Sequence, residues 1–562
     1  MIYDKLFIGG DLSGIQKFLY SITSRKAAVS LKGRSATLSD DMREIYYAST
    51  KKAVLEAGGQ IANADELYCS GGKFFFIATV TDDIRERVYM AIDKCLAECR
   101  TSIWKEHHGQ LGINICYVAF NEKDDVINVE GKYGEPPYVG QSKGPGQLWK
   151  VVSAGFALQK NQRFKELMLS DYDDFFANGN ALQMGPNRKV CAVTGIEFDT
   201  VELKKNEYTI PAKGEDDEIT VLPSVKRQIE KGETLRKDPK RGFKTFEEYA
   251  TTDSTYKKIQ NGEKGEIGDT YLAILRMDVD GLGKRFITGF KSLSEYKAFS
   301  NKLCDFFEKY VEEVLLHSID EDGNIYKQFM NIIYAGGDDL FIVGRWDKVI
   351  DFAKLIHDET ETHFENDGIS ISGGVAIVKP KYPISKAAEK AGAAEELAKQ
   401  FNPEKNAFHM LGKTISWNKH HVYRPNDKEE YEHEFAYVKH FKDKFLKYII
   451  KYNKDYGFSK SLLHKIMLYA AIADKNKERK ARGKTPNYSY IWHISYHLTR
   501  FMEKYKGYKK QSDPSKQIVM EELYKFCRSL RDDHLPENKG RNLELLAVAA
   551  RWAELTLQDR EK

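Results

Sequence analysis

The sequence predicts an α+β protein with two ferredoxin-like domains, an α/β linker between them and a C-terminal helical bundle. Three observations predict this fold: a duplicated pattern of strand, helix and glycine hairpin, a shared spacing within the two copies, and a tail with helical periodicity. A chain of 562 residues has room for about three or four domains. The assigned segments are 1–150 for the first domain, 151–262 for the linker, 263–420 for the second domain and 421–562 for the helical domain.

The composition excludes several classes of protein. Hydrophobic residues make up 41% and charged residues 30% of the chain, which is typical of globular proteins. The net charge of +4 is the difference between 87 basic and 83 acidic residues, so charge alone does not predict nucleic-acid binding. Seven scattered cysteines without a CxxC pair predict a cytoplasmic protein. No apolar run approaches the roughly 20 residues of a membrane span, so we expect no membrane partner.

Two copies of one pattern organise the first three quarters of the chain. The stretches that carry it are LFIGGDLSGIQKF (6–18), LYCSGGKFFFIA (67–78), AILRMDVDGLGKRF (273–286) and IYAGGDDLFIVG (333–344). In each copy a strand ends at an aspartate, a helical segment follows, and a glycine turn joins two further strands. Ser70 follows Asp11 by 59 residues, and Gly336 follows Asp278 by 58. The shared order predicts two related split-βαβ domains rather than two unrelated α/β segments.

The copies differ at the positions that could carry chemistry. Aligning Tyr68 with Tyr334 sets Ser70, Gly71, Gly72 and Lys73 against Gly336, Gly337, Asp338 and Asp339. Asp278 has a counterpart in Asp11, whereas Asp280 aligns with Ser13. The hairpin therefore carries a lysine in the first copy and two aspartates in the second.

The acids of the second copy predict a metal site. In a split-βαβ fold the strand that ends near Asp278 lies beside the hairpin that carries Asp338 and Asp339. Three clustered carboxylates repel one another unless a cation lies among them, and oxygen ligands favour Mg²⁺ or Mn²⁺. Gly336 and Gly337 leave space for a triphosphate. A plain Gly-Asp turn is the alternative for GGDD alone, and the MDVDG stretch at its fixed spacing favours the metal site.

The segment after the hairpin carries two lysines of interest. Residues 367–406 predict a strand, a proline-containing loop and an alanine-rich helix. Lys399 near the end of that helix and Lys405 beyond it can reach phosphates, and ordinary solvated lysines remain the alternative.

Seven motifs, in this order, resemble one known family. They are GDLSGIQKF, LKGRS, YCSGGKFFF, MDVDGLG, YAGGDDLF, ISGGVAI and the AEELAK…KN run, and they cover most of residues 1–420. The chain resembles the large subunit of type III CRISPR interference complexes, the Cas-ten family, in its Csm-type branch.

The resemblance implies a palm-type nucleotidyltransferase related in fold to nucleotidyl cyclases. Such subunits polymerise ATP into cyclic oligoadenylate for antiviral defence when guide RNA pairs with target RNA. By motif, Asp278, Asp338 and Asp339 would be the catalytic acids and hold Mg²⁺ or Mn²⁺. The nucleotide-binding set implied by the motifs is Gly336, Gly337, Asp280, Gly281, Ser372 (for the base), Lys399, Lys405 and, in the accepting palm, Ser70, Gly71 and Gly72. Implied partners are guide and target RNA and other complex subunits, including small helical ones that dock on the C-terminal domain.

This sequence departs from the family pattern in two ways, so two properties of the family are not expected of it. Many members begin with an HD nuclease domain, whereas this sequence opens at the first palm, so we expect no DNase activity from this polypeptide. The His357-Asp358 pair is expected on a solvated helix face. The family's four-cysteine zinc site has only Cys191 here, with Thr194 at the next position of a CxxC, so we expect that metal to be lost.

The linker contains a basic stretch, residues 225–246, with little apolar periodicity. A solvated linker is the expected structure, and contact with RNA or a partner is the alternative.

Three other functions stay open at this point. A non-catalytic scaffold subunit of the same complex would have no need of clustered acids. A palm enzyme that joins AMP to a different small molecule would use the same residues. A stand-alone diguanylate cyclase is disfavoured because Leu340 follows GGDD where that family's signature has Glu-Phe.

Overall fold

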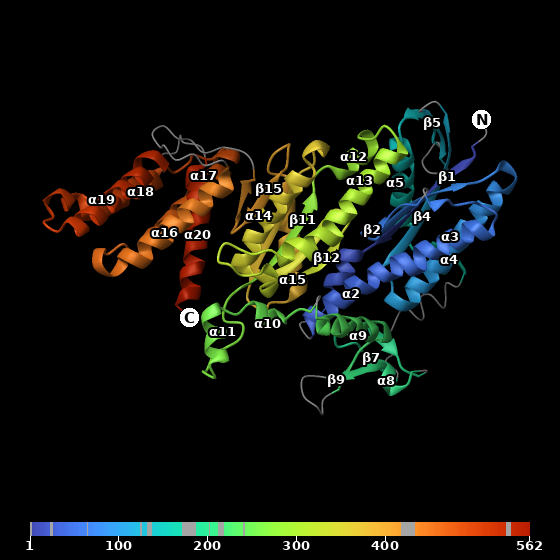
Figure 1. Cartoon of the computed structure of the whole chain (residues 1–562), viewed down its shortest axis with the longest axis horizontal. Coiled ribbons are helices and arrows are strands. Elements are labelled where there is room, and N and C mark those ends of the chain that lie inside the picture. The colour runs from blue at the N-terminus through green and yellow to red at the C-terminus, as the bar shows by residue number, and fades with distance from the viewer. Residues whose placement is uncertain are drawn as a thin grey trace. The chain divides into compact units, whose positions relative to one another are not determined.

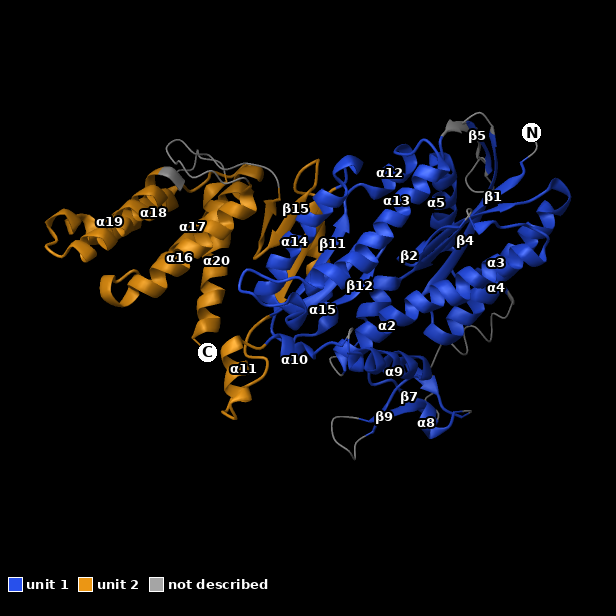
Figure 2. Ribbon diagram, in the orientation of Figure 1, with its two compact units in different colours: residues 1–250, 272–369, 378–389 blue, residues 251–271, 370–377, 390–562 orange. Residues whose placement is uncertain are grey.

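The structure is a computed structural model, and it has the mixed α+β composition that the sequence predicts (Figure 1). It describes residues 3–22, 26–63, 66–123, 126–131, 138–170, 187–201, 203–211, 218–239, 242–417, 433–534 and 541–561. The chain divides into two compact units (Figure 2). The first unit contains residues 1–250, 272–369 and 378–389, and the second contains residues 251–271, 370–377 and 390–562.

The first unit opens with a six-stranded antiparallel sheet in the order β2-β3-β1-β4-β5-β6. Its strands are β1 (Lys5–Ser13), β2 (Glu66–Ser70), β3 (Lys73–Thr79), β4 (Gly112–Lys123), β5 (Val126–Gly131) and β6 (Tyr138–Lys143). The helices around it are α1 (Ile15–Tyr20), α2 (Ala27–Asp41), the π-helical turn η1 (Met42–Tyr47), α3 (Ala48–Glu56), α4 (Asp82–His107), α5 (Gly146–Asn161) and α6 (Lys165–Ser170). Strand, helix, hairpin, helix and strand thus follow in the predicted order.

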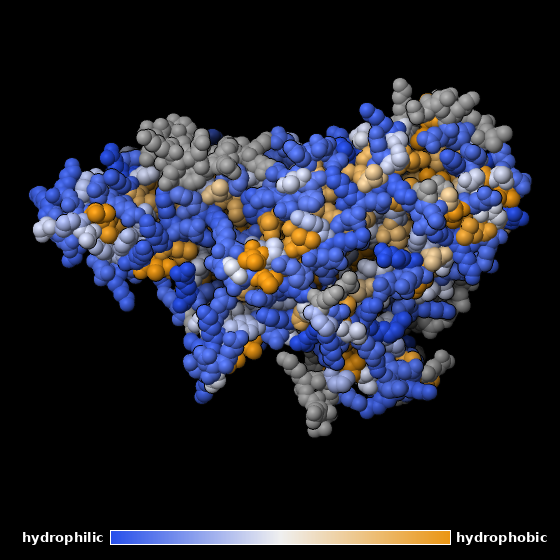
Figure 3. Space-filling view, in the orientation of Figure 1, coloured by the Kyte–Doolittle hydropathy of each residue, from blue (hydrophilic) through white to orange (hydrophobic). Residues whose placement is uncertain are grey.

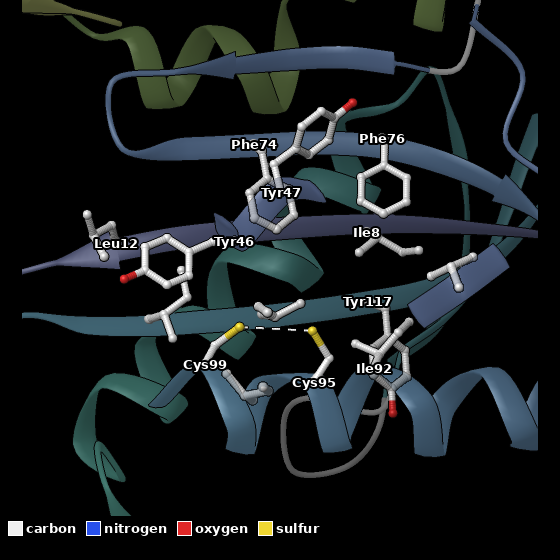
Figure 4. Close-up of a cluster of buried hydrophobic side chains, with 14 of the residues drawn as sticks. Ile8, Leu12, Tyr46, Tyr47, Phe74, Phe76, Ile92, Cys95, Cys99 and Tyr117 are labelled. Carbon is white, nitrogen blue, oxygen red and sulfur yellow. Dashed lines mark hydrogen bonds between the residues drawn. The ribbon is translucent and has the colours of Figure 1, made fainter. Parts of the chain in front are cut away.

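One face of this sheet buries an aromatic and aliphatic core (Figure 4). Alternate residues of the central strand, Ile8 and Leu12, point into it because strand side chains alternate between faces. Phe74 and Phe76 from β3 do the same. Helix α4 closes the core with residues at helical spacing, among them Ile92, Cys95 and Cys99. Each such fully buried large side chain contributes about 1.5–3 kcal/mol to folding.

One helix of the segment that follows the first sheet, α9 (Pro223–Lys237), packs against α2 rather than being solvated. The segment also contains β7 (Arg188–Val190), β8 (Glu197–Asp199), α8 (Lys205–Tyr208), β9 (Thr209–Pro211), β10 (Glu218–Thr220) and α10 (Phe246–Tyr249). Helix α9 buries Val225 and Ile229 and lies so close to α2 that a Cβ on Gly33 would be 1.8 Å from the Gln228 carbonyl oxygen. The expectation of a solvated linker is therefore wrong for α9, because two small glycines, Gly33 and Gly232, allow a close helix crossing that buries the short apolar face of Val225 and Ile229.

A second set of strands in the first unit repeats the order of the first. The elements are β11 (Leu272–Val279), α12 (Leu282–Thr288), α13 (Leu293–Cys304), the π-helical segment η3 (Asp305–Val314), the short turns η4 (Leu315–His317) and η5 (Tyr326–Gln328), β12 (Met330–Gly336), β13 (Asp339–Arg345), α14 (Trp346–His363) and η6 (Glu365–Asp367). Strand β13 lies between β11 and β12, as β3 lies between β1 and β2. In both copies the first helical segment includes a π-helical stretch.

The His357-Asp358 pair is placed differently from the expectation. His357 on α14 is completely buried, and its Nδ1 lies 3.0 Å from a carboxylate oxygen of Asp358, which is exposed. The expected solvated helix face is therefore wrong for His357 and correct for Asp358. A buried imidazole needs polar partners, and Asp358 and Glu361 on the same helix supply them.

The second unit contains α11 (Asp253–Gln260), most of β14 (Ile371–Val378), part of α15 (Ile384–Lys399), and a long helical tail. Strand β15 (Ala407–Met410) pairs in parallel with β14 and antiparallel with β16 (Lys413–Ser416). The tail comprises α16 (Glu434–Tyr456), α17 (Ser461–Ala481), α18 (Ser489–Tyr505), η7 (Lys506–Lys510), α19 (Pro514–Ser529), η8 (Leu530–His534) and α20 (Asn542–Arg560). Helix α20 packs against α16 and α17, and α18 packs against α19.

Among the described residues, no helix combines the length and the apolar character that crossing a bilayer requires. The face drawn in Figure 3 is largely hydrophilic, with hydrophobic residues in small separate groups.

Candidate active site

The two hairpins of the first unit have the same register. Asp11 on β1 lies opposite Lys73 on β3, and Asp278 on β11 lies opposite Asp339 on β13. Each hairpin also has a bulge at the same place, just before Tyr68 in β2 and just before Tyr334 in β12. The alignment of the two copies made from the sequence is therefore confirmed by the strand pairing.

The glycine turns of the two hairpins meet backbone to backbone. A Cβ on Gly71 would lie 2.9 Å from the carbonyl oxygen of Gly336 and 3.0 Å from the amide nitrogen of Gly337. Gly71 and Gly337 also have positive φ angles of 58° and 68°, which side chains disfavour. Glycine is thus required here both by the turn and by the neighbouring chain.

A cavity of about 320 Å³ lies where these turns meet, and residues of both copies line it. The first copy contributes Lys17 from α1 and Lys73 from β3, and the second contributes Arg276 from β11 together with Asp338 and Asp339. Asp11 of the first copy also lines the cavity, so it gathers three cations and three carboxylates, which suit a ligand that carries phosphates and a metal ion.

Asp338 and Asp339 are held at the edge of this cavity by the strand ladder, whereas Asp278 is not among the residues that line it. The amide of Val279 donates to the carbonyl oxygen of Asp338 at 3.2 Å, which ties the end of β11 to the turn. Gln16 Nε2 from the first copy donates to Asp339 Oδ2 at 3.3 Å. Asp278, Asp338 and Asp339 are all half-buried. Two aspartates directly opposite each other on paired strands repel, so this arrangement costs stability in the absence of a cation.

The carboxylate oxygens of Asp278, Asp338 and Asp339 do not converge on one point in the structure. In the described part of the chain, two groups of three or more potential ligands have donor atoms within 4.8 Å of one another, and neither group contains Asp278, Asp338 and Asp339 together. Repulsion between like charges accounts for this separation. The oxygen-only donor set still fits a hard divalent cation, which would bring the side chains together.

Two tyrosines next to the acids remain protonated. Burial raises the pKa of Tyr68 well above its usual value, and the nearby Cys304 and Asp338 add to the effect. Burial, followed by Asp339 and Asp338, raises the pKa of Tyr334 in the same direction. Both phenols are therefore available as hydrogen-bond donors at neutral pH.

The first copy neutralises its aspartate with a side chain of its own. Asp11 is buried, and its Oδ2 lies 2.8 Å from Nζ of Lys160 on α5. Lys73 also lies opposite Asp11 on the neighbouring strand. In the first copy, Lys160 and Lys73 thus balance the negative charge of Asp11, which in the second copy would need a metal ion.

A second polar contact joins the copies. Ser70 Oγ at the end of β2 donates to a carboxylate oxygen of Glu308 on η3. Burial raises the pKa of Glu308, and the hydrogen bond from Ser70 opposes that shift only in part. Tyr20 from α1 also packs on Phe341 from β13, with ring centroids 4.5 Å apart.

The remaining predicted site residues lie in two places. Gly281 has a positive φ of 69° and begins α12 directly after Asp280. In the second unit Ser372 is buried on β14, where its Oγ accepts a hydrogen bond of 3.4 Å from the Ala407 amide. Lys399 pairs with Glu395 one turn earlier on α15, at 2.7 Å. Lys405 has a positive φ of 59° in the loop before β15.

Several residues of the site were not predicted from the sequence. They are Gln16, Lys17, Tyr20, Lys160, Arg276 and Glu308. The helix-opening IQKF stretch after Asp11 was a usable signal for Gln16 and Lys17, because it follows the strand end as a phosphate-binding helix start does. Lys160 and Glu308 lie on helices that are distant in sequence from the hairpins, and only the fold brings them close to Asp11 and Ser70.

Two family models match separate segments of this chain. Residues 5–178 match the family described as Csm1 subunit domain B, and residues 271–409 match Cas10/Cmr2, second palm domain. The chain is thus similar to Cas10/Csm1 proteins in both segments.

Curated Cas10/Csm1 relatives are similar over most of this chain. The protein of Enterococcus italicus named CRISPR system single-strand-specific deoxyribonuclease Cas10/Csm1 (subtype III-A) is 25% identical over 459 residues, covering 74% of this chain and 55% of that protein. The protein of the same name from Methanocaldococcus jannaschii is 25% identical over 491 residues, covering 73% and 59%. The chain thus spans little more than half the length of these relatives.

Solved Cas10/Csm1 structures share the fold. A Csm1–Csm4 cassette in complex with pppApApA has a TM-score of 0.58 at 16% identity, covering 99% of this chain and 69% of that one. The cassette in complex with cA4 has a TM-score of 0.55 at 18% identity, covering 92% and 69%.

Proposed function

We propose that this chain is a nucleotidyltransferase that makes cyclic oligoadenylate from ATP within a type III-A CRISPR effector ribonucleoprotein, in antiviral defence. The observation that carries the proposal is the cavity at the meeting point of two equivalent glycine turns, of which one brings acids and the other a lysine. The similar cassettes were solved with one ATP, AMPPNP, pppApA, cA3 and cA4, which supports an adenine nucleotide as the substrate class.

The domain organisation is part of the same proposal. Residues 1–150 form a palm that accepts, 151–262 a linker domain, 263–420 a palm that catalyses, and 421–562 a helical bundle that docks small subunits. The split-βαβ strand order of both copies in the first unit supports the two-palm assignment.

The roles of the chain's residues follow from charge and position. Asp278, Asp338 and Asp339 would hold Mg²⁺ or Mn²⁺, and a metal ion there would supply activation of the attacking 3′-hydroxyl and neutralisation of the leaving pyrophosphate. Lys17, Lys73 and Arg276 bind the triphosphate oxygens, since all three line the cavity. The turn glycines let the nucleotides approach the backbone. Catalysis then rests on positioning and on charge stabilisation.

The remaining predicted residues and partners complete the proposal. Gly281 at the start of α12, Asp280 before it, and Lys399 and Lys405 contribute to nucleotide binding, and Ser372 contributes near the base. Guide RNA, target RNA and other complex subunits are the partners, and pairing of target RNA with the guide switches the reaction on.

The test is nucleotide turnover by the assembled complex. Wild-type complex with guide RNA, cognate target RNA, labelled ATP or GTP and Mg²⁺ or Mn²⁺ is expected to form a cyclic adenylate product. The Asp338→Ala/Asp339→Ala variant is expected to lose at least 100-fold of the rate. The matched control is Glu56→Ala/Glu98→Ala, which removes two acids from exposed faces of α3 and α4 and leaves the rate unchanged. A product that survives the first double substitution would refute the proposal.

The second candidate function joins AMP to a different small molecule in the same cavity. The asymmetry of the two hairpins favours it as the alternative, because the accepting copy need not bind ATP. Adenylate transfer to another metabolite with no oligoadenylate product would select it. A pure scaffold predicts no nucleotide product under any condition.

A further inference from the structure

A cluster of three potential metal ligands lies at the ends of two helices, apart from the candidate active site. Asp41 is the last residue of α2, and Glu106 and His107 are the last two residues of α4. One carboxylate oxygen of each acid and one ring nitrogen of His107 all lie within 4.8 Å of one another. The cluster thus gathers one nitrogen and two oxygen donors from helices that are distant in sequence.

The histidine of this cluster is buried without a hydrogen bond. His107 is 3% exposed, and neither of its ring nitrogens has a hydrogen-bond partner among the residues that the structure describes. Oδ2 of Asp41 is also buried without such a partner. Leaving a buried polar group unsatisfied costs about 1–3 kcal/mol. Native proteins rarely tolerate two such groups side by side, so the pair points to a bound ligand.

The charges around the cluster suit a cation. Burial, and next the neighbouring Glu106 carboxylate, raise the pKa of Asp41 to about 6. Burial, together with Arg34 and Arg227, lowers the pKa of His107 to about 3, so the imidazole is neutral, which is the form that binds metals. The carboxyl end of α4 adds the negative end of a helix dipole.

Two arginines near the cluster are compatible with an ion. Arg227 on α9 pairs with Glu106, but its side chain is 65% exposed and can turn to solvent. Arg34 Nη1 donates to the Phe18 carbonyl oxygen at 2.6 Å and its Nε donates to Gln228 Oε1 at 3.1 Å, while its Nη2 is buried without a hydrogen-bond partner among the described residues. None of these Arg34 nitrogens donates to His107 or to Asp41 Oδ2, which stay without a hydrogen bond in the described part of the chain.

We propose that Asp41, Glu106 and His107 bind a divalent first-row transition metal ion, with Zn²⁺ as the ion to test. Imidazole nitrogen favours such ions over Mg²⁺ and Ca²⁺, and carboxylates complete a mixed nitrogen and oxygen set. Three protein ligands leave a further position for water. The ion joins the ends of α2 and α4 next to α9, and its role is to fasten the helices of the first sheet to the segment that follows it.

The test measures Zn²⁺ binding by the full chain in the Asp338→Ala/Asp339→Ala background, so that the candidate active site contributes no ion. Equilibrium dialysis is expected to give one equivalent of Zn²⁺, and Co²⁺ in its place is expected to show visible absorption bands. His107→Gln and Asp41→Asn are each expected to weaken binding at least tenfold. Zn²⁺ is expected to raise the melting temperature of the parent and not of His107→Gln.

Two controls keep the proposal falsifiable. Asp358→Asn/Glu361→Gln alters the other described cluster, in which His357 already has acidic partners, and is expected to leave binding unchanged. Arg227→Gln is expected to bind Zn²⁺ at least as tightly as the parent, because it frees Glu106. If His107→Gln fails to fold, Glu106→Gln, which alters a side chain that is 20% exposed, replaces it. Absence of stoichiometric binding, or equal binding in every variant, would overturn the proposal.

Discussion

Asp278 and Asp339 lie directly opposite each other on the paired strands β11 and β13, at the ladder position where the first copy pairs Asp11 with Lys73. The same backbone therefore carries a repulsive pair in one copy and an attractive pair in the other. The repulsive pair has no structural benefit, which is why it is best explained by a ligand that supplies positive charge.

Substitution of Asp339 is expected to stabilise the protein while it abolishes nucleotide transfer. Asp339→Asn removes the repulsion with Asp278 and should raise the free energy of unfolding by about 0.2–1 kcal/mol without divalent ions. Asp11→Asn, at the same position of the first copy, removes an attraction to Lys160 and should lower it. Urea unfolding in the presence of a chelator measures the free energy of unfolding of both variants. A change of the same sign in Asp339→Asn and Asp11→Asn would contradict this account.

A side chain on Gly71 is expected to disrupt the contact between the hairpins. Gly71→Ala forces a Cβ to within 2.9 Å of the Gly336 carbonyl oxygen at a positive φ, so we expect a loss of about 1–3 kcal/mol and of most activity. Gly368→Ala is the matched control, since Gly368 has a φ of 61° and no atom near its would-be Cβ. Thermal unfolding and nucleotide turnover should show a larger loss for Gly71→Ala than for Gly368→Ala. Equal losses would assign the effect to backbone strain alone.

Lys160 is expected to stabilise the first copy through Asp11. Lys160→Ala leaves a buried carboxylate without its closest cation, and we expect a loss of about 1–3 kcal/mol, reduced by solvent screening because Lys160 is 45% exposed. Lys94→Ala, which breaks an exposed pair with Glu98 on α4, should cost less than about 0.5 kcal/mol. In a double-mutant cycle with Asp11→Asn, additive losses would show that the pair contributes nothing.

Glu308 is expected to make stability depend on pH. Burial raises its pKa in the folded protein, so the folded state holds a proton that the unfolded state releases. The stability that protonated Glu308 contributes is therefore present below the ordinary glutamate pKa and is lost as the pH rises through the raised pKa of the folded state. Glu308→Gln keeps an acceptor for Ser70 and should be more stable than the wild type at neutral pH, with a flatter profile. Parallel unfolding profiles against pH for the two proteins would rule this out.

Local patterns in the sequence predicted most of the fold of the first unit and the equivalence of the hairpins. The aspartate, the glycine turn and the apolar runs are short-range signals, and the strand register bears them out from Asp11 to Asp339. The packing of helix α9 on α2 was missed because its apolar face is short, with Val225 and Ile229, and glycine contacts complete it. His357 was misplaced because a polar residue can be buried where neighbours on the same helix satisfy it.

The chemistry of the candidate site was predicted only in part. Sequence motifs pointed to the acids of the second copy, which stand together in the GGDD turn. Lys17 follows the strand end at Asp11, whereas the cavity cation Arg276 and the counter-charge Lys160 come from separate elements, and no spacing rule relates these two to the acids. Such residues become visible only when the strands and helices that carry them are brought together.

The matched bulges have a consequence for how this chain can change in evolution. Each glycine turn begins three residues after its tyrosine, and the hairpins touch through Gly71 and Gly336. One residue inserted into either hairpin would carry its turn about 3.3 Å past the other. The side chains after the turns differ between the copies, lysine in one and aspartate in the other, but both hairpins have the same number of residues between tyrosine and turn. Insertions and deletions should therefore be tolerated in the outer loops of this protein and rejected in these two hairpins.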